Sequence, residues 1–170
     1  NENGQYCIYK SDRYGFNNID KEWDTKEIEY LLVGDSFIHG DCVNRPDDVS
    51  SVLRKISNRS VLNLGYRGNG PITQYASLRE YMPKNVKNIL WFYFEENDIS
   101  DIKLEIKKPK LTMYLNDKNY NLNLKSKQES INQLHRLRIE KDIIEKKILD
   151  KYWESYYSTK KKILRFLRLN

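Results

Sequence analysis

A serine that follows an apolar run and a Gly-Asp turn is the strongest chemical signal in this sequence. Residues 31–40 read Leu-Leu-Val-Gly-Asp-Ser-Phe-Ile-His-Gly, so Ser36 comes directly after Gly34 and Asp35. A serine at the carboxyl end of a buried strand is a typical position for a nucleophile in an α/β protein. Its hydroxyl reacts only when a base takes its proton and hydrogen-bond donors stabilise the developing oxyanion.

Two further loops carry residues that can supply such donors. Residues 65–70 form a glycine-rich turn in which Gly68 can bring its N–H close to a substrate, and residues 95–98 contain Asn97, whose side-chain amide also donates. The Ser36 N–H, the Gly68 N–H and the Asn97 amide together predict an oxyanion hole for acyl transfer.

The elements that must position these loops are predicted from hydrophobic patterning. Strands are expected at residues 30–37, 60–64 and 86–94, and helices from Asp47 or Asp48 to about residue 58 and over residues 71–82. Alternation of strands and helices indicates β-α-β-α-β with a parallel sheet and right-handed crossovers. The third run lacks strict alternation, which predicts a central strand. The three candidate loops then lie at the carboxyl ends of the strands.

These three blocks together resemble the SGNH or GDSL-type hydrolases, over about residues 28–102. Gly34-Asp35-Ser36 matches the family's first block, residues 63–68 match the second, and Asn97-Asp98 matches the end of the third, although Glu95 replaces its leading glycine. The resemblance implies a three-layer α/β/α, flavodoxin-like fold and an ester or acyl hydrolase, or a transferase, that needs no metal or cofactor. It assigns Ser36 as nucleophile, Gly68 and Asn97 as oxyanion residues, and Gly34, Asp35 and Asp98 as supporting residues.

The resemblance also implies a small-molecule acyl or carbohydrate ester substrate and, with the Asn-, Lys-, Ile- and Tyr-rich composition, a bacterial protein of the cytoplasm or envelope. Residues 12–18 look like the lead-in segment of some bacterial members.

The histidine base of the family is missing from this sequence. The family's Asp-x-x-His block is absent, and the two histidines are His39 and His135, the latter preceded by Asn132 instead of aspartate. His39 is a weak candidate for the base, because one helical turn after Ser36 is an awkward place for proton abstraction. We favour a base that lies outside these residues. The alternatives are a serine without a partner in a binding or scaffold domain, and a base supplied by another chain.

The sequence changes character after residue 102. Residues 1–102 carry 12 Lys/Arg and 16 Asp/Glu, a net charge of −4, whereas residues 103–170 carry 18 and 8, a net charge of +10. We expect residues 110–115 and 120–124 to form a β-hairpin, followed by a long basic helix from residue 126 to about 169, as an extension of the first part. This helix is expected to pack on the domain or on a partner helix rather than on a membrane surface. No nucleic-acid partner is expected, because no recognition motif accompanies the charge.

The remaining composition sets limits on cofactors and location. Cys7 and Cys42 lie in no metal-binding pattern, and we expect two ordinary buried thiols in preference to a disulfide. No apolar run approaches the roughly 18 residues of a membrane span, which predicts a soluble protein.

Overall fold

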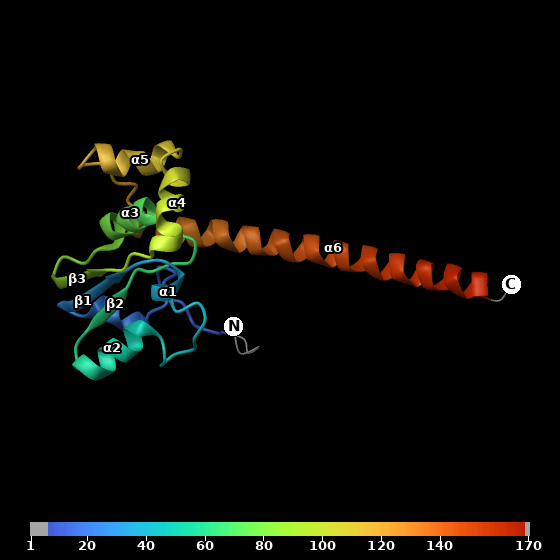
Figure 1. The fold of residues 1–170 in the computed structure, drawn as a ribbon, viewed down its shortest axis with the longest axis horizontal. Helices are drawn as coiled ribbons and strands as arrows, with labels where there is room; N and C mark the ends of the chain where they lie inside the picture. The colour runs from blue at the N-terminus through green and yellow to red at the C-terminus, as the bar shows by residue number, and fades with distance from the viewer. Residues whose placement is uncertain (1–6, 169–170) are drawn as a thin grey trace. The chain divides into compact units, whose positions relative to one another are not determined.

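The computed structural model describes residues 7–168, with side chains through Ile163, and it contains two compact units that meet in sequence between Lys125 and Ser126. The first unit is a mixed α/β structure around a three-stranded parallel sheet, and the second is formed by one long helix (Figure 1). Residues 103–125, which we grouped with the long helix, lie in the first unit.

The sheet confirms the predicted parallel β-α-β-α-β order. Strands β1 (Ile28–Val33), β2 (Val61–Asn63) and β3 (Val86–Trp91) lie in the order β2-β1-β3. Leu32 is aligned with Asn63 and with Leu90, so all three strands end at the same side of the sheet. The loops that follow them therefore emerge together.

The predicted central position of β3 is wrong for the described part of the chain, where β3 is an edge strand. Its side chains are largely exposed, and Trp91 keeps 44% of its surface accessible. Residues 92–94, predicted as part of the strand, lie between β3 and α4, and only Phe92 N–H still donates to β1, to the Val33 carbonyl at 2.8 Å. Exposed Lys87 and Asn88 lie in the first half of β3, whereas Ile89, Trp91 and residues 92–94 are large, apolar and exposed, so the end of this edge is unusually apolar for an unpaired strand.

Helices cover both faces of the sheet, which gives three layers (Figure 1). Helix α2 (Val49–Ser57) lies on one side, and α3 (Pro71–Tyr81) lies on the other with α4 (Glu95–Glu105) and α5 (Pro109–Asn116). Alternate residues of β1 supply the two cores. Leu31 packs with Leu62 and Tyr81, and Leu32 packs with Val61 and Leu53.

Local signals explain both crossover helices. The Asp48 side chain accepts a hydrogen bond from Ser51 N–H at 3.0 Å and caps α2, as predicted. Pro71 occupies the first turn of α3, where its missing N–H costs nothing, and the helix ends before Pro83.

The predicted hairpin is wrong, because residues 110–115 belong to helix α5 and residues 120–124 are not a strand. Two neighbouring side chains of α3 hold this segment instead. Arg79 donates to the carbonyls of Tyr114 (2.7 Å) and Tyr120 (2.8 Å). Buried Glu80 accepts from the Tyr114 hydroxyl and from the N–H groups of residues 122 and 124. These side chains satisfy the backbone groups that a strand ladder would otherwise have paired.

The second unit confirms the long basic helix as α6 (Gln128–Arg168), which follows a short 3-10 turn at Lys125–Lys127. Another 3-10 turn, Asp20–Asp24, precedes β1 in the first unit. None of the helices in the described residues combines the length and apolar character needed to cross a membrane.

Candidate functional site

Ser36 is the first residue of α1 (Ser36–His39), a single helical turn that begins three residues after β1 ends. The Asp35 side chain accepts a hydrogen bond from Phe37 N–H at 3.0 Å, which caps this turn. A side chain at Gly34 could not be accommodated, since a Cβ there would lie 2.5 Å from Cγ1 of Ile38. Asp35 and Gly34 thus hold the turn, and Ser36 remains half-buried and accessible.

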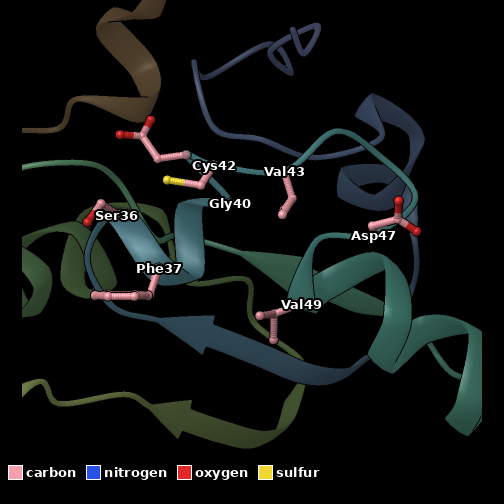
Figure 2. A pocket seen from close by; sticks show the side chains of 8 residues that line it. Ser36, Phe37, Gly40, Cys42, Val43, Asp47 and Val49 are labelled. Carbon is pink, nitrogen blue, oxygen red and sulfur yellow. The ribbon is translucent and has the colours of Figure 1, made fainter. Parts of the chain in front are cut away.

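A pocket of about 440 Å³ lies beside this turn. Figure 2 shows Ser36, Phe37 and Cys42 toward one end and Val43, Asp47 and Val49 toward the other; Gly40 and Asp41 complete the lining. The Ser36 hydroxyl points away from the Val49 end (Figure 2). Ser36 therefore lines a pocket of small-molecule size.

The three loops predicted to form the site meet in space. Tyr66 N–H donates to the Gly34 carbonyl at 3.3 Å, which joins the second loop to the first. The rings of Phe37 and Phe94 have centroids 5.0 Å apart, which joins the first loop to the third. This convergence follows from the parallel strands and needs no further folding information.

Gly68 lies in the second loop, whereas residues 95–98, predicted as the third loop, form the first turn of α4 and include Asn97; neither Gly68 nor Asn97 lines the pocket beside Ser36. Gly68 has φ +73°, so glycine is needed there for its left-handed backbone and not for close approach, because a Cβ would meet nothing within 4 Å. Close approach occurs at Gly65, where a Cβ would lie 2.8 Å from the backbone nitrogen of His39. The side-chain oxygen of half-buried Asn97 is enclosed and has no hydrogen-bond partner in the described residues.

His39 is a structural residue in this arrangement. Only 1% of its surface is accessible; Nδ1 lies 3.3 Å from the Gly65 carbonyl oxygen and Nε2 lies 3.8 Å from Oδ1 of Asp41. The rings of Tyr9 and Tyr66 contact it edge-to-face. Both ring nitrogens are thus directed at groups other than the Ser36 hydroxyl. His135 is exposed on α6.

Asp98 is a buried acid at the start of α4. It is fully buried, its Oδ2 accepts from Phe94 N–H at 2.7 Å, and its Oδ1 has no partner among the described residues. Burial, followed by the negative charges of Asp35, Asp101 and Glu105, raises the pKa of Asp98 above its usual value. Asp98 therefore fixes the entry to α4, next to Asn97, and favours its own neutral form.

A set of buried asparagines braces the first two loops, and sequence reasoning missed it. Asn17 donates to the His39 carbonyl at 2.7 Å, at the end of α1. Asn18 donates to the Asn63 carbonyl and accepts from Asn63 N–H, both at 2.8 Å. Asn63 in turn accepts from Gly65 N–H at 2.7 Å. The lead-in segment at residues 12–18 is thus a support for the site; two adjacent asparagines after an aromatic residue were its only local signal.

Glu105 braces the second loop from α4. Its carboxylate accepts hydrogen bonds from Gly70 N–H at 3.1 Å and from Ile72 N–H at 2.9 Å, and it is almost fully buried. These N–H groups lie at the buried start of α3, where they have no partner within the helix and an acidic side chain stabilises them. The third loop and its helix therefore also position the second loop.

The thiols differ from the prediction. Cys7 and Cys42 are both free; Cys7 is half-buried and Cys42 is exposed at the pocket, so Cys42 is not a buried thiol. Among the described residues, no group of three or more His, Cys, Asp or Glu side chains is arranged to hold a metal ion.

No family model matches the chain, and neither the curated proteins nor the solved structures give a match.

Proposed function

We propose that the first unit is the core of an SGNH-type serine hydrolase or acyltransferase in which Ser36 is the nucleophile. The observation that carries this proposal is the placement of an accessible serine at the first residue of α1, after the middle strand of a parallel sheet and beside a pocket. The Ser36 oxygen attacks the substrate carbonyl carbon, the ester bond to the leaving alcohol breaks, and an acyl-serine ester forms. Water then hydrolyses this intermediate, or an acceptor alcohol takes the acyl group.

The proton of Ser36 must go to a base that the described residues do not offer, since His39 is buried with both nitrogens engaged elsewhere and His135 is exposed on α6. We assign the base to a polypeptide segment that pairs with the edge of β3 left unpaired in the described residues. The carboxyl-terminal end of that edge is apolar and adjoins the third loop, so a strand added there would end beside the site.

The test is hydrolysis of a short p-nitrophenyl ester and labelling by a fluorophosphonate, both with the intact protein. Ser36→Ala is expected to abolish labelling and to lower turnover by roughly 10³-fold or more. Ser158→Ala, on exposed α6, is the matched control and should change neither. Full activity of Ser36→Ala would overturn the proposal.

A non-catalytic binding domain for a carbohydrate or a protein partner is the second candidate. It is favoured by one observation, that both ring nitrogens of the neighbouring His39 face groups other than Ser36. It predicts no turnover by the intact protein, and ligand binding that survives Ser36→Ala.

A further inference from the structure

The two halves of α6 differ in charge, although they form one continuous helix. Residues 128–145 carry three Lys/Arg and four Asp/Glu, a net charge of −1, whereas residues 146–168 carry eight and two, a net charge of +6. The basic character predicted for the whole extension is therefore concentrated in the second half of α6, which we call the basic half.

Apolar side chains of the basic half gather along one side of the helix. Ile148, Tyr152 and Tyr156 are spaced four residues apart and so follow one line, and Leu149, Trp153 and Tyr157 follow the next. The Trp153 ring contacts those of Tyr152, Tyr156 and Tyr157, with centroids 5.5–6.1 Å apart. These large side chains are nevertheless exposed; Tyr157 keeps 62% of its surface accessible and Trp153 keeps 48%. The result is an unburied aromatic surface.

The opposite side of the basic half is polar and mainly cationic. At 3.6 residues per turn, it carries these charged residues: Lys147, Asp150, Lys151, Glu154, Lys161 and Lys162. Lys146 and Lys160 fall within the aromatic side, and Lys160 continues the line of Ile148, Tyr152 and Tyr156; a lysine there can extend its flexible stem until the ammonium reaches a polar layer.

The first half of α6 lacks this separation. Arg138, Lys141 and Glu145 fall on the same side as Ile131 and Leu134, so charge interrupts the apolar surface there. An amphipathic surface of useful length therefore exists only in the basic half.

A coiled coil along the whole of α6 is disfavoured. The seven-residue repeat that includes Leu149, Tyr152 and Tyr156 meets polar core positions in the first half: Glu145, Asp142, Arg138 and His135. Aromatic side chains opposite lysines are instead the pattern of helices that lie in the headgroup region of a bilayer. The excess positive charge complements anionic lipid.

We propose that the basic half of α6 binds the surface of an anionic lipid bilayer, with its aromatic side in the headgroup region and its lysines against lipid phosphates. This binding is independent of the reaction at Ser36. It places the helix on a membrane surface, in contrast to the packing partner expected from sequence.

The experiment is co-sedimentation of the full chain with vesicles of phosphatidylcholine, with or without phosphatidylglycerol, at low and high salt. Binding is expected to anionic vesicles and to weaken at high salt. A variant with Lys160, Lys161 and Lys162 changed to Gln should bind anionic vesicles roughly 100-fold more weakly, since each lysine near the surface contributes comparably. The double variant Trp153→Ser and Tyr157→Ser should also lose binding, with helix content checked by circular dichroism.

The matched control removes the same charge from the first half, by changing Arg136, Arg138 and Lys141 to Gln, and should leave binding nearly unchanged. Equal losses in the two triple variants would overturn the proposal, because net charge and not the basic half would then drive binding. Equal binding to neutral vesicles, or none to anionic ones, would also overturn it. A concentration-dependent oligomer that the Trp153/Tyr157 variant disperses would assign the surface to a second copy of the chain instead.

Discussion

The two units of this protein are held in shape by different means. In residues 7–125, buried polar side chains such as Asn18, Glu80 and Glu105 bond to backbone groups of distant segments. In α6 the described side chains are exposed or half-buried, and the helix depends on bonds between residues one turn apart. The first unit therefore positions loops through its interior, whereas the second presents a surface. Substitutions of the same chemical kind should consequently have different effects in the two units.

The largest difference in stability between the two units is expected for Glu→Gln substitutions, with Glu80→Gln as the change in the first unit. The Glu80 carboxylate accepts hydrogen bonds from the Tyr114 hydroxyl and from two backbone N–H groups. A glutamine amide in its place would direct its NH₂ group, which can only donate, at one of these donors. We expect the free energy of unfolding to fall by about 3 kcal/mol. Urea unfolding followed by tryptophan fluorescence in a Trp153→Phe background measures it, since Trp23 and Trp91 then report on the first unit.

Glu154→Gln, an equivalent change on α6, is the control and should alter the free energy of unfolding by less than about 0.5 kcal/mol. A similarly small effect of Glu80→Gln would mean that the buried carboxylate does not hold residues 114–124 in place.

A pH-dependent difference is expected for Asp98→Asn. Because the pKa of Asp98 is raised on folding, its contribution to stability is fully present below the unfolded pKa of about 3.9 and is lost as pH rises through the folded pKa. The asparagine variant stays neutral, so at pH 7 it should be more stable than the parent by about 1 kcal/mol. The free energies of unfolding of the parent and of the Asp98→Asn variant should converge near pH 3.

Unfolding curves measured across this pH range test the expectation, with Asp142→Asn on exposed α6 as the control that should show no such trend. A variant that is less stable than the parent at pH 7 would contradict a destabilising charge at Asp98.

The smallest effect is expected for Glu145→Gln. Glu145 and Lys141 form an exposed ion pair of 3.7 Å, one turn apart on α6. Such pairs stabilise a helix by only ~0.3 kcal/mol, and salt screens them. Circular dichroism on heating measures the loss of helix. The melting curve of the variant should differ slightly from that of the parent at low salt and not at all at high salt. A large shift would show that α6 depends on side-chain pairs more than its exposure suggests.

Much of the scaffold could be predicted because its signals are local. Asp48 caps α2 and Pro71 opens α3, and the runs predicted as strands at residues 30–37 and 60–64 overlap β1 and β2, although β1 ends at Val33 and α1 begins at Ser36. The position of Ser36 after the first strand follows from the same signals. Local patterns were insufficient at residues 110–115. These residues were predicted to form a strand, but they belong to a helix that begins at Pro109.

The sequence by itself determined the order of strands and helices, the turn that presents Ser36, and the long helix, because backbone propensities and hydrophobic periods act between neighbours. Only the tertiary structure decided that His39 is enclosed, that β3 is an edge in the described chain, and that Asn17, Asn18 and Glu105 support the loops. These roles arise from hydrogen bonds between residues 22 to 45 positions apart. No pattern along the chain encodes such partners, since folding brings them together through the packing of the whole unit.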